Sequence, residues 1–157
     1  MSATTPLLEA LTDEERARLL IGAKPRAFME KEHLLREGWE GSSMFFVDEG
    51  EVEVRRNGNL IAKLGPGATV GEMSLLDPAP RSATVTAVGY VNTRELDRAT
   101  VWGMLADGDP AAIKLLQGIT ATVCARLDGV NRLVQEEVVR PRGNPFSRLI
   151  GAVFGRS

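Results

Sequence analysis

The chain has 157 residues and a formal net charge of −2, and 43% of its residues are hydrophobic while 25% are charged. That length fits a single domain with one core, and that charge provides no basic field to attract nucleic acid or an anionic membrane. A single histidine, His33, and a single cysteine, Cys124, exclude a metal site built from several histidines and an internal disulfide. We expect a cytoplasmic protein with His33 on its surface and Cys124 in an apolar core.

Residues 7 to 22 are predicted to form a helix. Thr12 and Glu15 have the spacing of a capping box, in which each side chain satisfies a free amide near the other. Pro25 marks the end of the segment, so we assign residues 1–25 to an N-terminal helical segment. The first residues lack the basic stretch and apolar run of a secretory signal.

Residues 26 to 96 are predicted to form a series of short strands. Val52 and Val54 alternate with charged residues, which is the period-two pattern of a half-buried strand. Asn57-Gly58 suits a tight hairpin turn, because both central residues of that turn need positive φ. Many short strands at this spacing are typical of a sandwich or barrel, and a double-sheet jelly roll fits well. The expected strands are 44–48, 51–56, 60–64, 83–88 and 91–96.

Residues 97 to 139 are predicted to be helical again. Asp97 can cap a short helix, and Asp109-Pro110 combines an N-cap with proline at the first helical position. The long helix that follows carries apolar residues at alternating spacings of three and four, which makes a seam for another surface. The seam can pack on its own domain or pair with a second copy, and we slightly favour a homodimer through residues 110–138.

The segment 140–157 is a basic amphipathic tail with four arginines and no acidic residue. Its arginines could touch an acidic partner or remain solvated. It could dock on its own domain, on a partner or on a membrane surface, and docking on its own domain is the prediction. The tail is too short for a helix-turn-helix unit, so direct nucleic-acid binding is not expected.

The segment from Gly65 to Val85 has the features of a phosphate-binding loop. A strand ends in a glycine turn, and Gly71 then allows an anion to approach the backbone closely. A very short helix follows, and the amides of Glu72, Met73 and Ser74 at its start are expected to point outward, unpaired, as a site for a phosphate.

The same segment supplies a cation and a hydrogen-bond acceptor. The chain returns through a stiff proline loop to Arg81, whose guanidinium can hold a phosphate with two parallel hydrogen bonds. Ser82 can add a hydroxyl, and Ala83 an amide. Glu72 can accept a hydrogen bond from a sugar hydroxyl, so the donor set with its one acceptor fits a ribose-phosphate ligand.

Two alternatives compete with this interpretation. Gly65-x-Gly67-x-x-x-Gly71 resembles a dinucleotide-binding glycine loop, but that fold needs a crossover helix of about ten or more residues, and only residues 72–76 are available. Arg81 and Glu72 could instead form only a surface ion pair, worth about 0–1 kcal/mol. The glycine and the ordered strand pattern favour the anion site.

Several of these motifs occur in the order found in a known family. Gly71-Glu72 and Pro80-Arg81-Ser82-Ala83-Thr84 resemble the phosphate-binding cassette of cyclic nucleotide-binding domains, the family of the catabolite activator protein and of the regulatory subunit of cAMP-dependent protein kinase. The upstream runs 35–38, 44–47 and 50–54 look like early strands of that family, and the match covers roughly residues 20–136. The resemblance implies an eight-stranded jelly-roll β-barrel, or double-stranded β-helix, with an N-terminal helix and C-terminal helices, in a cyclic nucleotide-binding domain that spans residues 26–139.

The resemblance also implies roles for individual residues. Glu72 would bind the ribose 2′-hydroxyl and Arg81 the cyclic phosphate, while the amides of Gly71 and Ala83, with Ser82, would complete the phosphate-binding site.

The long helix would close over the base, and Asn131 and Arg132 lie in the part of it that could reach the base. Val70 stands where the family often has phenylalanine, which bears on how tightly the pocket closes. The resemblance favours cAMP over cGMP as the ligand.

The sequence thus predicts a sensor that binds a cyclic nucleotide and signals through C-terminal helix movement to an unidentified protein partner, without an output domain of its own. The alternative is a protein-interaction or scaffold module that retains the fold without binding ligand. We expect neither a cofactor nor a metal, and no enzymatic activity, because no nucleophile with a base and no metal cluster is visible.

Overall fold

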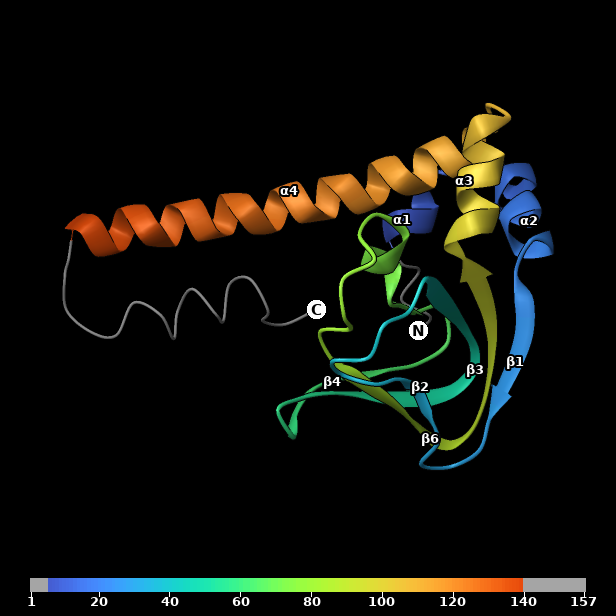
Figure 1. The fold of residues 1–157 in the computed structure, drawn as a ribbon, viewed down its shortest axis with the longest axis horizontal. Helices are drawn as coiled ribbons and strands as arrows, with labels where there is room; N and C mark the ends of the chain where they lie inside the picture. Colours follow the sequence, from blue (N-terminus) through green and yellow to red (C-terminus); the bar gives the residue numbers. More distant parts are fainter. Residues whose placement is uncertain (1–5, 140–157) are drawn as a thin grey trace. The chain divides into compact units, whose positions relative to one another are not determined.

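The computed structural model describes residues 6–139, which contain one antiparallel sheet with helices before and after it (Figure 1). This arrangement confirms the expected mainly β chain with flanking helices. The chain divides into two compact units, Met1–Ile119 and Thr120–Ser157. The elements are α1 (Pro6–Glu9), α2 (Asp13–Ile21), β1 (Lys24–Phe28), β2 (His33–Leu35), β3 (Ser43–Arg56), β4 (Asn59–Leu64), β5 (Thr69–Val70), the 3-10 helix η1 (Glu72–Leu75), β6 (Thr84–Asp97), α3 (Arg98–Ala106) and α4 (Pro110–Val139).

The predicted N-terminal helix is divided into two. Thr12 has extended backbone angles, φ −68° and ψ 163°, so it interrupts the helix and caps α2. The capping box is confirmed, since the Thr12 side chain accepts from the Glu15 amide at 3.2 Å and the Glu15 carboxylate accepts from the Thr12 amide at 2.9 Å.

The sheet has the strand order β1-β6-β3-β4, with β2 also paired to β6 and β5 to β3, and every pair is antiparallel. The segments predicted as four separate strands form two long ones, because β3 and β6 stay paired through register shifts near Gly50. The described residues therefore form six strands in a sheet that is not closed, and the expected count of eight is not confirmed. The predicted hairpin turn is confirmed, with Asn57 at φ 51° and Gly58 at φ 80°.

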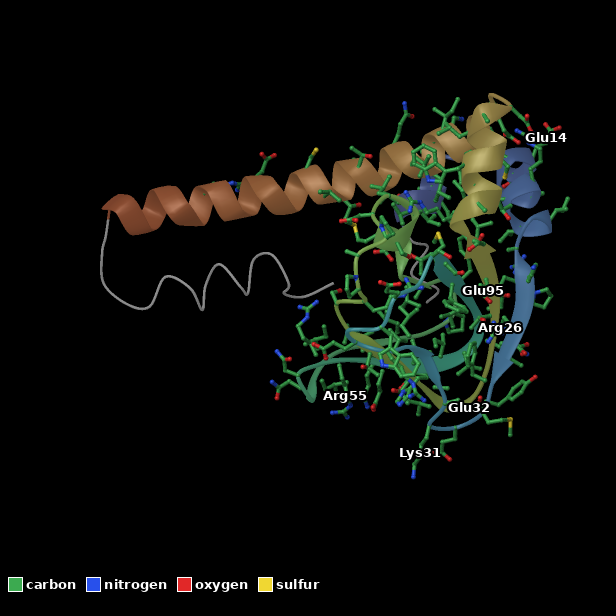
Figure 2. The ribbon with its side chains drawn as sticks, viewed as in Figure 1. Glu14, Arg26, Lys31, Glu32, Arg55 and Glu95 are labelled. Carbon is green, nitrogen blue, oxygen red and sulfur yellow. The ribbon has the colours of Figure 1, made fainter. Side chains whose placement is uncertain are left out.

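Edge pairing in the sheet is reinforced by charge. Figure 2 shows Arg26 of β1 beside Glu95 of β6, and their side chains approach to 2.7 Å. On the other side of β6, Arg94 makes two hydrogen bonds to Asp48 of β3, at 2.6 and 2.8 Å. Such partly exposed pairs each contribute about 1 kcal/mol or less.

Two groups of buried apolar side chains hold the first unit together. One lies among the strands and includes Phe28 and Phe45, whose rings meet edge to face at a centroid distance of 5.8 Å. The other joins the helices to the sheet and includes Leu19, Val101 and Leu115, all fully buried. The site described below is built on the strands and on η1, and α3 packs close to it.

The C-terminal helices begin where the sequence predicts. The Asp97 carboxylate caps α3 by accepting from the Ala99 amide, and the Asp109 carboxylate caps α4 by accepting from the Ala111 amide. His33 is exposed as expected. Cys124 was expected in a core, but it is exposed on α4.

Some predictions extend beyond the first unit. Whether the α4 seam packs against its own domain or a second copy stays a prediction, and the tail 140–157 lies outside the described residues. Within residues 6–139, no helix combines the length and apolar character that crossing a bilayer requires.

Candidate functional site

The segment from Gly71 to Ala83, here called the cradle, begins where β5 ends. Gly71 has φ 76°, a left-handed conformation that favours glycine. A Cβ atom on this residue would lie 2.8 Å from Nη1 of Arg81 and 3.1 Å from the Ser43 carbonyl oxygen. Both the backbone conformation and the close approach of Arg81 therefore require glycine here.

The short helix after Gly71 is the 3-10 helix η1, and this changes one prediction. The Ser74 amide was expected to be unpaired, but it donates to the Gly71 carbonyl at 3.2 Å. A 3-10 helix closes its first hydrogen bond one residue earlier than an α-helix, so the third amide is already used. Only the amides of Glu72 and Met73 precede that first bond.

The Ser74 side chain also points inward and not toward a ligand. The residue is only 4% exposed, and its Oγ lies 2.6 Å from the Gly71 carbonyl oxygen and 3.1 Å from that of Ser43 on β3. The Ser74 hydroxyl thus ties the start of η1 to β3.

Arg81 places its guanidinium against the start of η1. Its Nη1 donates to Ser74 Oγ at 2.6 Å and to the Gly71 carbonyl at 3.4 Å, while Nη2 donates to the Ser43 carbonyl at 2.7 Å. All three acceptors are neutral. Among residues 6–139, no carboxylate forms a salt bridge with Arg81, so the ion pair with Glu72 that the sequence left open is not present.

This cation is partly withdrawn from water. Burial lowers the pKa of the Arg81 guanidinium, and the charge of Glu95 opposes that shift. Arginine nevertheless stays protonated. A half-buried cation without an acidic partner among the described residues has lost part of its hydration without gaining a counter-charge, and a bound anion could compensate that cost.

The loop between β2 and β3 forms the other side of the site. The Arg81 amide donates to the Trp39 carbonyl at 2.9 Å, and the Gly38 amide donates to the Arg81 carbonyl at 2.8 Å. A Cβ atom on Gly41 would lie 2.5 Å from Arg81 Nη2 and 2.6 Å from Nε. Gly41 therefore packs closely against the guanidinium edge that joins these two nitrogens, and any side chain at this position would collide with it.

The sequence did not identify Trp39, Gly41 or Ser43 as part of the site. Trp39 and Ser43 contribute backbone carbonyls, which every residue has, so their side chains carry no signal. Gly41 follows Gly38 by three residues just before a buried strand, and that spacing was the one available sign.

The other predicted site residues lie along the same segment. Glu72 is half-buried, and Met73 is 37% exposed. Ser82 is exposed, and its carbonyl accepts from Arg56 Nε at 2.8 Å. Ala83 packs against the apolar side chains of the sheet.

Two predicted residues belong to the second unit. Asn131 and Arg132 are on α4 within the second unit, so their predicted approach to a base stays a prediction.

The far end of η1 is attached to α3. The indole Nε1 of Trp102 donates to the Leu75 carbonyl, the last residue of η1, at 2.8 Å. The guanidinium carbon of Arg98 lies 5.9 Å from the centre of the Trp102 ring. A displacement of η1 would therefore be transmitted to α3 through this hydrogen bond.

Metal chemistry finds no support in the described part of the chain. No group of three or more His, Cys, Asp or Glu residues within it is arranged to hold a metal ion.

Comparison with known proteins relates this geometry to a family. The sequence profile described as cyclic nucleotide-binding domain matches residues 25–107. The chain is 35% identical over 100 residues to the cAMP-dependent protein kinase regulatory subunit of Mycosarcoma maydis, a match that covers 61% of this chain and 19% of that protein. The chain thus spans about one fifth of the length of that relative.

Among the solved structures that share the fold, two illustrate the similarity. The N-terminal domain of a transcriptional regulator from Streptomyces coelicolor A3(2) aligns with a TM-score of 0.71 and 32% identity, over 79% of this chain and 90% of that one. The regulatory subunit of a cAMP-independent protein kinase A from Trypanosoma brucei aligns with a TM-score of 0.62 and 25% identity, over 76% and 43% respectively.

Proposed function

We propose that this chain, which belongs to the cyclic nucleotide-binding domain family, binds a cyclic nucleotide in the cradle and prefers cAMP to cGMP. The observation that carries the proposal is the Arg81 guanidinium, which is half-buried and, within the described part of the chain, held by neutral oxygens. A cyclic nucleotide has one negative charge, on its phosphodiester. Its phosphate would give the guanidinium a charged partner where water is partly excluded and the interaction is correspondingly strong.

The free edge of the guanidinium is the proposed phosphate contact. The hydrogen bonds to Ser43, Gly71 and Ser74 use hydrogens on Nη1 and one on Nη2. A guanidinium has five N–H donors, so Nε and the second hydrogen of Nη2 remain for two parallel bonds to phosphate oxygens.

With the phosphate bound to Arg81, the other predicted site residues would contact the phosphate, the ribose and the base. The amides of Gly71 and Ala83, the hydroxyl of Ser82 and the start of η1 would surround the phosphate. Glu72 would accept a hydrogen bond from the ribose 2′-hydroxyl, and we propose that Asn131 and Arg132 contact the base.

We propose that the bound state is read by the C-terminal helices. Phosphate capture that draws η1 inward would move the Leu75 carbonyl, and with it Trp102 of α3. A ligand shifts such an equilibrium only by its difference in affinity for the two arrangements. A protein partner, or a second copy through residues 110–138, would sense the change.

A scaffold module without ligand is the second candidate, and one comparison favours it. The Trypanosoma brucei protein that shares this fold is described as the regulatory subunit of a cAMP-independent kinase. The fold therefore occurs in a protein whose kinase does not depend on cAMP.

Isothermal titration with cAMP and cGMP separates the two candidates. We expect the wild type to bind cAMP more tightly than cGMP, and Arg81→Ala to bind cAMP at least about tenfold more weakly, because a hydrogen bond to a charged group contributes about 1.5–3 kcal/mol. Arg55→Ala is the matched control: it removes a guanidinium on β3 that pairs with Glu53, and it should leave the affinity unchanged. Absence of binding by the wild type would support the scaffold function.

A further inference from the structure

We propose that Ser74 is a positioning residue that fixes the Arg81 guanidinium in the orientation needed to bind an anion. The inference rests on the proposed function, but it assigns a role to a side chain that would not touch the ligand. It follows from the contacts of the Ser74 hydroxyl, which lies 2.6 Å from Arg81 Nη1.

The hydroxyl has one hydrogen and three polar neighbours. Its Oγ lies 2.6 Å from the Gly71 carbonyl oxygen and 3.1 Å from the Ser43 carbonyl oxygen. Both neighbours are acceptors, so the single hydrogen points toward this pair of carbonyls. The lone pairs of Oγ are then directed at Arg81, which can only donate. The proton arrangement therefore makes Ser74 an acceptor for the guanidinium.

Two anchors together fix the planar guanidinium. Nη1 is held by the Ser74 hydroxyl and Nη2 by the Ser43 carbonyl, at 2.6 and 2.7 Å. With either terminal nitrogen released, the group can turn about its side-chain torsions. With both held, the edge formed by Nε and Nη2 is kept beside Gly41, which has no side chain to cover it.

Water cannot easily replace the serine hydroxyl. Ser74 is 4% exposed, and its hydroxyl faces β3, where it donates to the Ser43 carbonyl. Loss of the hydroxyl would leave an N–H of Arg81 without its partner in a dry position, and the side chain would turn outward to find water. An arginine that must be ordered on binding gives a weaker complex than one already in place.

The first experiment is a double-mutant cycle measured by cAMP titration. We expect Ser74→Ala to weaken cAMP binding about tenfold to a hundredfold, the range for a hydrogen bond to a charged group, and Ser74→Thr, which keeps the hydroxyl, to restore most of the affinity. In an Arg81→Ala background, Ser74→Ala should have no further effect, because the serine acts through the arginine. NMR titration to millimolar cAMP extends the cycle to weak binders.

A matched control separates positioning from general loss of a buried hydroxyl. Thr93 is 2% exposed and its hydroxyl donates to the Arg26 carbonyl at 2.9 Å, so Thr93→Val removes a comparable group from the sheet. It should leave cAMP affinity at the wild-type value. An equal loss of affinity from Ser74→Ala with and without Arg81, or no loss at all, would overturn the inference.

A second readout does not need a ligand. In the ligand-free protein, the Arg81 Nε–Hε NMR signal reports the environment and mobility of the guanidinium. We expect Ser74→Ala to shift and narrow this signal, and Ser74→Thr to return it to its position. If the wild type binds neither cAMP nor cGMP, the proposed function fails, yet this signal still tests the role of Ser74. An unchanged Arg81 signal in Ser74→Ala would overturn the positioning role.

Discussion

The substitution Gly41→Ala should weaken ligand binding while leaving the fold intact. The new Cβ atom would lie 2.5 Å from Arg81 Nη2 and 2.6 Å from Nε, whereas ordinary contacts begin at 3.4 Å. The guanidinium would therefore have to move by about 1 Å to reach van der Waals distance. Such a shift lengthens the 2.7 Å bond from Nη2 to the Ser43 carbonyl beyond hydrogen-bonding range.

The expected size of the effect follows from the bonds that are disturbed. A hydrogen bond from a charged group contributes about 1.5–3 kcal/mol, so cAMP affinity should fall about tenfold to a hundredfold at 1.4 kcal/mol per factor of ten. Stability should change little, because the half-exposed guanidinium can turn to water. Alanine in place of glycine also restricts the unfolded chain, which is worth about 0.4–1 kcal/mol where the backbone allows it.

Calorimetric titration with cAMP, paired with thermal unfolding, measures both quantities. Gly65→Ala is the matched control, because a Cβ atom there meets nothing within 4 Å. It should keep wild-type affinity. Wild-type affinity in Gly41→Ala, combined with weak binding by Arg81→Ala, would show that the orientation of the guanidinium does not set affinity and would refute the reasoning.

Three further perturbations test other parts of the structure. The Ala111 amide and Arg18 lower the pKa of the Asp109 carboxyl below its usual 3.8. A group whose pKa is lower in the folded state stabilises the fold above its unfolded pKa and loses that effect as pH falls through the folded value. Asp109→Asn should therefore lower the free energy of unfolding in urea at pH 7, and a difference in that free energy from the wild type that does not shrink below about pH 3.8 would contradict this. Trp102→Phe removes the indole donor, so cAMP should still bind but no longer change hydrogen exchange in α3, and an unchanged exchange response would argue against this link. Gly50→Ala should lower the midpoint of thermal unfolding, because φ at this residue is +88° and the new Cβ would meet the Tyr90 carbonyl. The left-handed conformation alone costs about 1–2 kcal/mol for alanine. An unchanged midpoint would contradict the assigned geometry.

Local signals in the sequence predicted local structure well. The capping box at Thr12 and the turn at Asn57-Gly58 were recognisable because each depends on residues adjacent in the chain. The number of strands was harder to predict. Gly50 lies between the predicted strands 44–48 and 51–56, but the long partner strand continues the pairing through a bulge, and that partner lies about forty residues away in sequence.

In the candidate site, too, local features could be predicted from the sequence, whereas features that depend on the folded structure could not. Gly71 and Arg81 could be predicted, because glycine and arginine have distinctive chemistry next to a short helix. The amide of Ser74 was assigned wrongly, since the sequence does not distinguish a 3-10 turn from the first turn of an α-helix. Ser43 was missed because it acts through its backbone carbonyl and reaches Arg81 only once β3 is folded.

A crystal structure of the chain grown with cAMP would test the central claim most directly. We expect the cyclic phosphate to lie within hydrogen-bonding distance of Arg81 Nε and Nη2, with Nη1 still bonded to Ser74 Oγ. Nucleotide density at any other place, or an Arg81 guanidinium without phosphate beside it at saturating cAMP, would contradict the account.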